Sequence, residues 1–149
     1  DSAVSRGLGD VYKRQAVDTP HGLMVPKIRN VDQMSIKEIG SALRKTSRLC
    51  RDLKIDKKEF FGGSMTISSL GGIGGTFFTP IINPPEVAIL GVGKSFDRLV
   101  KVNDKFVSRK ILPISLSYDH RIIDGAEGAR FCVYLGKCLG KDFAFKLAV

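Results

Sequence analysis

The chain of 149 residues contains no tryptophan, only two histidines and only three cysteines. Cys50, Cys132 and Cys138 lack the short paired spacing of zinc ligands, so we expect reduced thiols and no metal site. No apolar run approaches the roughly 18 residues that a membrane-spanning helix requires. The first residues also lack the basic-then-apolar order of a secretory signal. These absences argue against a metalloprotein, a membrane protein and an exported protein.

The charge of the chain is unbalanced but dispersed. It has 24 Lys and Arg residues against 15 Asp and Glu residues, a net charge of +9. A positive net charge of this size is compatible with binding to nucleic acid, to an anionic membrane surface or to a small phosphate-bearing ligand. The sequence contains no run of five like charges and no basic helical stripe interleaved with aromatic residues. We therefore expect no nucleic acid and no membrane as partner, although a basic nucleic-acid binder remains an alternative.

The organisation of the chain changes near residue 16. Residues 1–15 show neither helical periodicity nor strand alternation, so we expect a disordered or foreign leader. Residues 16–149 have the pattern of one globular domain. His21 precedes a glycine in the stretch TPHGL, which predicts a turn.

Two helices are expected, and each opens with a capping signal. Ser35 is followed three residues later by Glu38, and apolar residues then recur at helical spacing, which predicts an amphipathic helix over 36–53. We interpret the basic outer face of this helix as solvated surface rather than as a binding stripe. Asp124 has a glutamate three residues after it and is the predicted N-cap of a second helix over 125–140.

Several segments have strand patterns. The continuous apolar run from 87 to 93 predicts a strand that is buried on both faces of a sheet. Asn103 and Asp104 form a predicted two-residue hairpin turn. Strands with helices at both ends of the pattern predict an α/β or α+β layered sheet. The expected strands cover 64–69, 87–93, 98–102, 105–109 and 111–118.

The glycine-rich run from Gly71 to Gly75 resembles a phosphate-binding loop at first sight. No Lys-Ser or Lys-Thr pair follows a G-x-x-x-x-G frame, and a G-x-G-x-x-G frame that starts at Gly72 has Phe77 at its last position. We therefore interpret the run as a turn that lets two backbones approach closely.

The stretch SYDHRIIDGAEG contains the most reactive combination of residues. His120 lies between a predicted strand and a predicted helix, where α/β proteins often place chemistry. Its ordinary pKa of about 6.5 allows the neutral ring to accept a proton at physiological pH. His120 and Asp124 have no third ligand at metal-binding spacing, and no Gly-x-Ser-x-Gly elbow occurs. On these residues alone, a general base and a structural histidine both remain open.

The longer stretch SLSYDHRIIDGAEGARF resembles the Asp-His-Arg-x-x-Asp/Asn-Gly signature of the dihydrolipoamide acyltransferases, the E2 components of 2-oxo acid dehydrogenase complexes. The stretches AVDTPHGLMVPKIRNVD, GGSMTISSLGGIGGTFFTPIINPPEVAILGVGK and LPISLSYDH are similar to the same family in the same order. The resemblance covers residues 16–143. It implies a chloramphenicol-acetyltransferase-like fold, a two-layer α+β sandwich in which a mixed sheet packs against helices. It also implies that the chain is the C-terminal part of a catalytic domain that is longer on its N-terminal side.

The resemblance implies roles for individual residues. His120 matches the general base of the family, and Ser68, which lies 52 positions earlier, matches the serine that hydrogen-bonds the tetrahedral intermediate. Asp124 matches the acidic or amide position that supports the site. Arg121 matches the motif arginine, which we interpret as structural.

The resemblance also implies a reaction and its partners. The reaction is acyl transfer, most like acetyl transfer in the pyruvate dehydrogenase complex, between dihydrolipoamide and coenzyme A by thioester exchange. Coenzyme A is then a substrate, the lipoyl group belongs to a separate domain, and no metal takes part. The implied partners are a homotrimer and a larger core, lipoyl domains, and the E1 and E3 components. The compartment is the bacterial cytoplasm or the mitochondrial matrix, and the alternative function is a catalytically inactive assembly fragment of the same core.

The family places each active site between two subunits of a trimer. We therefore expect that Ser68 and His120 do not meet within one chain. We also expect apolar surface to be left uncovered, because the strand over 87–93 needs cover on both faces and the 134 residues after the leader supply few covering helices.

Overall fold

The computed structural model describes residues 13–140 and residue 143. The described chain forms one five-stranded sheet, two two-stranded ribbons and two α-helices, with two short 3-10 turns. In chain order the elements are β1 (Lys13–Gln15), β2 (Val17–Thr19), β3 (Gly22–Met24), β4 (Lys27–Ile28), η1 (Val31–Gln33), α1 (Ile36–Arg51), η2 (Lys57–Phe60), β5 (Met65–Ser69), β6 (Ala88–Val92), β7 (Phe96–Val102), β8 (Lys105–Ile111), β9 (Ile114–Tyr118) and α2 (Gly125–Cys138).

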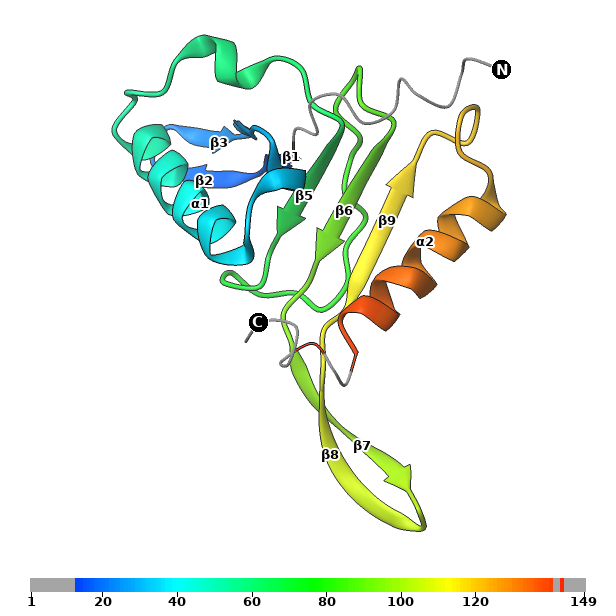
Figure 1. Ribbon diagram of the computed structural model, residues 1–149. Helices are drawn as coiled ribbons and strands as arrows, with labels where there is room; N and C mark the ends of the chain where they lie inside the picture. Colours follow the sequence, from blue (N-terminus) through cyan, green and yellow to red (C-terminus); the bar gives the residue numbers. More distant parts are fainter. Residues whose placement is uncertain (1–12, 141–142, 144–149) are drawn as a thin grey trace.

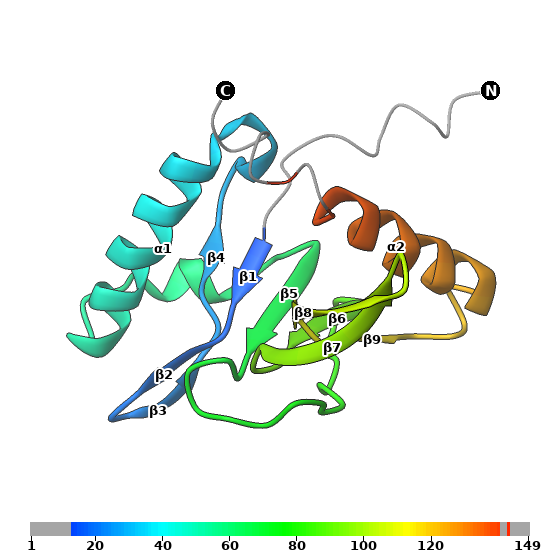
Figure 2. The same cartoon turned by 90° about the horizontal axis from the view of Figure 1, so that it is seen from below.

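The main sheet has the strand order β4-β1-β5-β6-β9 and mixed polarity. β5 runs parallel to both β1 and β6, whereas β4 and β9 run antiparallel to their neighbours. Both helices lie on one face of the sheet, and the long connection from β5 to β6 crosses the other face (Figures 1 and 2). This is the expected two-layer arrangement of a mixed sheet with helices. No helix in the described residues is long and apolar enough to cross a membrane.

The start of α1 confirms the predicted capping pair. The Ser35 hydroxyl accepts the Glu38 backbone N–H at 3.3 Å, and the Glu38 carboxylate accepts the Ser35 backbone N–H at 2.7 Å. The Ser35 hydroxyl also donates to this carboxylate and thereby lowers the pKa of Glu38. The helix ends at Arg51, two residues earlier than expected, and Leu53 then adopts a left-handed backbone with a φ of 54°.

The central strand β6 is the most completely buried part of the chain. Ala88, Ile89 and Leu90 are each less than a tenth exposed, so both faces of the strand are covered, as predicted. Register with β5 pairs Thr66 with Ile89 and Ser68 with Gly91. Since successive residues of a strand point to opposite faces, Thr66 and Ser68 share the face that lies away from the helices.

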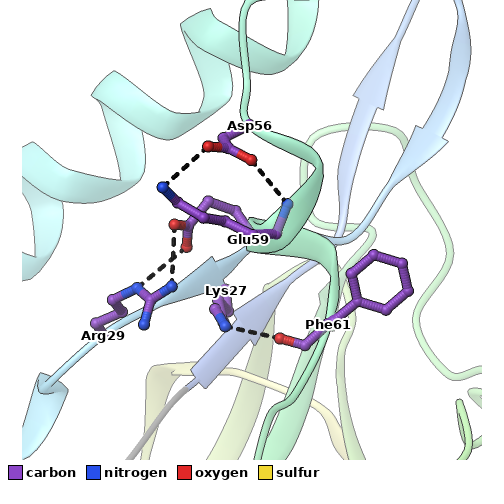
Figure 3. A network of polar contacts seen from close by, with 6 residues as sticks. Lys27, Arg29, Asp56, Glu59 and Phe61 are labelled. Atoms are coloured by element: carbon purple, nitrogen blue, oxygen red, sulfur yellow. Dashed lines mark hydrogen bonds and ion pairs between the residues drawn. The ribbon is translucent and has the colours of Figure 1, made fainter.

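Polar contacts hold the segment between α1 and β5 against β4 (Figure 3). The Lys27 ammonium donates to the Phe61 carbonyl at 2.7 Å, and the Arg29 guanidinium makes two hydrogen bonds to the Glu59 carboxylate at 3.1 and 3.3 Å. The Asp56 carboxylate accepts the Lys58 backbone N–H at 2.9 Å and so caps η2. Exposed pairs of this kind each add about 1 kcal/mol or less. Together they fix where the chain enters β5.

The structure corrects the expectation for residues 13–15, which we had assigned to a leader outside the fold. They form β1, and Arg14, only 6% exposed, lies opposite Thr66 of β5. The Arg14 guanidinium donates to the buried Glu86 carboxylate at 3.3 Å, and this carboxylate also accepts the Thr66 hydroxyl. The ion-pair partner of Arg14 lies 72 positions away in the sequence. The sequence around Arg14 therefore shows no local pattern that would predict a buried strand. The remainder of the expected leader lies outside the described residues.

The expected strand over 111–118 is divided in two. Ile111 ends β8, and β9 begins only at Ile114. The intervening Pro113 has no N–H to donate to a ladder, and its carbonyl instead accepts the Gly93 backbone N–H at 3.0 Å. The chain therefore turns at this proline from the outer ribbon into the main sheet.

The predicted hairpin is confirmed. Asn103 and Asp104 have positive φ values of 47° and 61°, as a two-residue turn of type I′ requires. The flanking strands β7 and β8 contain seven residues each. They pair with each other as a two-stranded ribbon that extends away from the main sheet (Figure 1).

Gly93 allows the connection after β5 to lie directly on β6. A Cβ added at Gly93 would overlap the backbone carbonyl of Thr76, and no side-chain motion relieves that clash. We predict that Gly93→Ala lowers the free energy of unfolding by about 1–3 kcal/mol. The matched control is Gly72→Ala, because a Cβ at Gly72 meets nothing within 4 Å. Urea denaturation of both variants measures the difference, and equal stabilities would contradict the prediction.

Candidate active site

Ser68 lies near the end of β5 and faces an apolar hollow. The hollow has a volume of about 400 Å³ and is formed by β3, β5, β6, the connection that precedes β6, and Ala16 between β1 and β2. Within the described residues, the Ser68 hydroxyl makes no hydrogen bond, so it is available to a ligand. The other lining residues are Ala16, Leu23, Val25, Thr66, Pro80, Ile81, Ile82, Asn83 and Ile89.

The glycine run after Ser68 forms a closed turn, as predicted. Gly74 and Gly75 have positive φ values of 136° and 87°, and the Gly75 carbonyl accepts the Lys94 backbone N–H at 2.9 Å. Further along the same connection, Phe78 packs on Gly91, the β6 partner of Ser68. A Cβ at Gly91 would come within 2.9 Å of the Phe78 ring. The turn and the ring therefore fix the surroundings of Ser68.

His120 lies in the loop between β9 and α2, as predicted, and its side chain is exposed. Its ring centroid is 5.8 Å from that of Tyr118, the last residue of β9. Its Nε2 atom lies 3.8 Å from the position that a Cβ would take at Gly125. The loop therefore presents an imidazole to the outside of the chain.

Asp119 and Arg121 hold this loop on either side of His120. The Arg121 guanidinium donates to the Asp119 carboxylate at 2.6 and 2.9 Å, and the Arg121 backbone N–H donates to it at 3.0 Å. These hydrogen bonds lower the pKa of Asp119 from 3.8 to about 2 and raise the pKa of Arg121. Our sequence reasoning interpreted Arg121 as structural but missed Asp119, although the alternation of opposite charges at 119 and 121 was visible.

Asp124 is the N-cap of α2, as predicted. Its carboxylate accepts the Glu127 backbone N–H at 2.8 Å, and the helix begins at Gly125. Both the start of the helix and its approximate length are therefore confirmed, although it ends at Cys138 rather than at 140. The capping bond holds this carboxylate at the end of the loop that carries His120.

Ser68 and His120 lie at opposite ends of the sheet. Ser68 is level with Gly91 of β6 and, through it, with Ser115 of β9. β9 continues to Tyr118 before the loop begins, which adds about 10 Å along the strand at ~3.3 Å per residue. Two strand spacings of about 4.8 Å separate β5 from β9 sideways. The prediction that the two side chains do not meet within one chain is confirmed.

A second hollow lies on the helix side of the same strand end. Its volume is about 640 Å³, and it is bounded by α1, by β1 and β2, and by the glycine turn. We interpreted the basic face of α1 as solvated surface, but Arg44, Arg48 and Arg51 line this concave site together with the Ser47 and Ser69 hydroxyls. Neither Arg48 nor Arg51 has a carboxylate partner within the described residues.

Few acidic side chains and few possible metal ligands lie around the two hollows and the His120 loop. Asp18 and Asp52 also line the arginine-containing hollow. Among the described residues, no three His, Cys, Asp or Glu side chains lie close enough together to hold a metal ion.

Residues 15–144 match the family of 2-oxoacid dehydrogenases acyltransferase (catalytic domain). The dihydrolipoyllysine-residue acetyltransferase component of the pyruvate dehydrogenase complex from Cupriavidus necator is 52% identical over 128 residues, which cover 86% of this chain and 23% of that protein. The crystal structure of Azotobacter vinelandii dihydrolipoamide acetyltransferase has a TM-score of 0.86 and 48% identity, over 91% of this chain and 56% of that chain. The cubic core of a pyruvate dehydrogenase multienzyme complex gives the same values. The chain thus spans about a quarter of the curated relative and about half of the solved cores.

The ion pair beside His120 predicts a pH dependence of stability. The folded pKa of Asp119 is about 2 against an ordinary 3.8, so the pair stabilises the fold above pH 3.8 and loses this contribution as the pH falls toward 2. In Arg121→Gln the pKa of Asp119 rises toward 3.8, so the variant is less stable than the wild type near neutral pH, and the difference disappears at low pH. Urea unfolding across this range and NMR titration of the Asp119 carboxyl measure both effects.

The control for this prediction is Arg130→Gln, which removes an exposed arginine of α2 that has no ion pair in the described part of the chain. It is expected to leave the Asp119 titration unchanged. An Asp119 pKa near 2 in Arg121→Gln would show that the guanidinium is not the cause.

Proposed function

The chain belongs to the 2-oxoacid dehydrogenases acyltransferase (catalytic domain) family, and from this premise we propose that it transfers an acetyl group between dihydrolipoamide and coenzyme A. One observation carries the proposal. A serine, a histidine and an asparagine were investigated for their role in the catalytic mechanism of the Azotobacter vinelandii enzyme, with 52 positions between the first two and four between the last two. The same intervals separate Ser68, His120 and Asp124.

His120 is the proposed general base. The thiol of coenzyme A or dihydrolipoamide has a pKa of about 8.5 and is mostly protonated at neutral pH. The neutral imidazole removes this proton as the sulfur attacks the thioester carbonyl carbon, a contribution of about 10²–10⁴ in rate. The tetrahedral intermediate then expels the other sulfur, which takes the proton from the imidazolium. One thioester bond forms and one breaks, and His120 returns to its neutral state.

Ser68 is the proposed donor to the developing oxyanion. Its hydroxyl has no partner in the described residues and faces the apolar hollow. The hollow is lined largely by apolar side chains, among them the buried Ile89, and apolar surroundings strengthen a hydrogen bond to a localised negative charge. Such a donor is worth about 3 kcal/mol in comparable sites.

The active unit in this proposal contains several copies of the chain, most simply a homotrimer within a larger core. The support is the separation of Ser68 from His120 within one chain. Large apolar side chains are exposed beside both groups: Leu23 and Ile81 at the Ser68 hollow are 69% and 87% exposed, and Ile122 beside His120 is 64% exposed. Exposed apolar clusters of this kind mark interaction surfaces.

The arginine-containing hollow is the proposed binding site for the nucleotide part of coenzyme A. Guanidinium groups pair with phosphate in a bidentate manner, and three of them line this hollow. Ser69 points into it, while its neighbour Ser68 points into the other hollow. The carboxylates of Asp18 and Asp52 favour a ligand that also offers hydroxyl or amino donors, as a nucleotide does, over bare phosphate.

The wider assignment follows the relatives. Lipoyl domains would deliver the acyl group, and the E1 and E3 components would act before and after this step. The named relatives are bacterial, which supports the bacterial cytoplasm among the two compartments that the resemblance implies. A second candidate is a catalytically inactive assembly part of the same core. A thioester-exchange assay with coenzyme A distinguishes the two candidates.

We predict that Ser68→Ala and His120→Ala complement each other. Alone, His120→Ala loses at least about 10² in exchange rate, and Ser68→Ala loses about 10²–10³. When the two variants are unfolded together and refolded, about a quarter of randomly paired interfaces contain both intact groups. Exchange activity should recover to that extent.

The control for complementation is a mixture of the two variants folded separately and combined without refolding, which should stay inactive on the assay timescale. No recovery after joint refolding of variants that associate like the wild type would contradict a site shared between chains.

We further predict that Arg48→Gln combined with Arg51→Gln raises the KM for coenzyme A by about 10–100-fold, because charged hydrogen bonds are lost, while kcat changes little. The increase should be absent when pantetheine, which lacks the nucleotide, replaces coenzyme A. Lys45→Gln, a change at an exposed lysine of α1 outside this hollow, is the matched control. An equal loss with both thiols would contradict the proposed position of the nucleotide.

A further inference from the structure

Few contacts hold the imidazole of His120 in one orientation. The side chain is exposed, and within the described residues it makes no hydrogen bond and no ion pair. The charged groups beside it are bound elsewhere: the Asp119 carboxylate pairs with Arg121, and the Asp124 carboxylate accepts the Glu127 backbone N–H. An exposed side chain samples several rotamers. A general base at this position therefore needs some other contact that orients its ring.

The ring of Tyr118 provides such a contact. The centroids of the Tyr118 and His120 rings are 5.8 Å apart, and the ring planes are tilted by 38°. Aromatic rings attract each other at this separation. The Tyr118 hydroxyl oxygen and the His120 Nε2 atom each lie 3.8 Å from the position that a Cβ would take at Gly125. The two side chains therefore converge where the first residue of α2 has no side chain of its own.

The Tyr118 ring is itself held between the sheet and α2. Tyr118 pairs with Ala88 of β6, and the next backbone N–H, that of Asp119, donates to the Val87 carbonyl at 2.8 Å. On the helix side, Gly128 is buried, and a Cβ added there would come within 2.9 and 3.1 Å of the Tyr118 Cε1 and Cζ atoms. The helix backbone thus packs directly on the ring, and close packing leaves such a ring little freedom to move.

We propose that Tyr118 is a positioning residue for His120. Its ring, held against Gly128, is the surface on which the imidazole packs, so that the base keeps one orientation toward the thiol. The inference rests on the proposed function and deepens it. Within the described residues the Tyr118 hydroxyl makes no hydrogen bond, so the ring and not the hydroxyl supplies the effect.

The kinetic test compares Tyr118→Leu with Tyr118→Phe in the thioester-exchange assay. Tyr118→Leu removes the ring and is expected to lower kcat about 10–100-fold, because a misplaced base reacts slowly. The KM for coenzyme A should change less than about twofold, because Tyr118 acts through His120 and not through the substrate. Tyr118→Phe keeps the ring and should restore kcat. Equal kcat values for the leucine variant and the wild type would overturn the proposal.

The matched control is Tyr134→Leu, which makes the same change at an exposed tyrosine of α2. It should keep the kcat of the wild type. Circular dichroism and urea denaturation are measured on every variant, so that rates are compared only under conditions in which each variant is folded. A loss of kcat in Tyr134→Leu equal to that in Tyr118→Leu would overturn the assignment to Tyr118.

NMR of the histidine rings tests the contact without any activity. The chain has only two histidines, so His21 in the turn between β2 and β3 is an internal reference. Nuclear Overhauser effects between the His120 and Tyr118 ring protons are expected in the wild type. The His120 signals should shift in Tyr118→Leu as the ring current is lost, while the His21 signals stay unchanged. Unchanged His120 signals would contradict the proposal.

A second substitution moves the ring without removing it. In Gly128→Ala the new methyl group displaces the Tyr118 ring or the helix, so kcat should fall while both Tyr118 and His120 remain present. In the Tyr118→Leu background the same change should lower kcat little further, because the ring it displaces is already absent. Fully additive losses would show that Gly128 and Tyr118 act independently.

The outcomes separate this proposal from the proposed function. If His120→Ala exchanges thioesters like the wild type, the general base is wrong and the positioning role fails with it. If His120→Ala is inactive while Tyr118→Leu keeps the kcat of the wild type, only the positioning role is wrong. A loss of kcat in Tyr118→Leu that Tyr118→Phe restores, together with the shifted His120 signals, supports both.

Discussion

The antiparallel pairing of β9 with β6, next to the parallel pairing of β6 with β5, is the constraint on which the rest of the structure depends. It puts the C-terminal end of β5 and the C-terminal end of β9 at opposite ends of one sheet, measured along the strands. Burial of Ala88, Ile89 and Leu90 holds β6 between its two neighbours, because these apolar side chains pack on both faces of the sheet. A serine at one end and a histidine past the other therefore cannot act together in one chain.

Strand alternation explains how one strand end faces two hollows. Ser68 and Ser69 are consecutive, so their side chains leave opposite faces of β5. Ser68 faces the apolar hollow, and Ser69 faces the hollow lined by arginines. The glycine turn that follows them lets the chain fold back closely on β6. In our proposal, the thioester and the nucleotide part of coenzyme A occupy these two hollows on either side of a single strand.

Features whose chemistry is complete within a few residues could be predicted from the sequence. The caps at Ser35 and Asp124 are satisfied three residues away, and the Asn103–Asp104 turn depends only on its own backbone. The resemblance to a known family implies that His120 is a general base, whereas the residues alone left a structural role open. Local chemistry and family signature together covered most of the fold.

The features that could not be predicted depend on distant partners. Arg14 belongs to no apolar pattern, and its buried guanidinium depends on two distant partners, the Glu86 carboxylate 72 positions away and the Phe60 carbonyl. The basic face of α1 forms the wall of a hollow only because the glycine turn, some 20 residues later in the chain, closes the other side. The uncovered β7–β8 ribbon likewise follows from the path of the chain rather than from its alternation.

The central claim is that the catalytic site is assembled from two chains, and cross-linking tests it most directly. In a background with Cys132→Ser and Cys138→Ser, which leaves only the buried Cys50, one chain carries Ser68→Cys and the other His120→Cys. The two chains are refolded together and treated with a short cross-linker that has two thiol-reactive groups. The account predicts a covalent dimer in the mixture and none in either variant alone. Absence of that dimer from associated chains, or an internal cross-link in a monomeric chain carrying both changes, would contradict it.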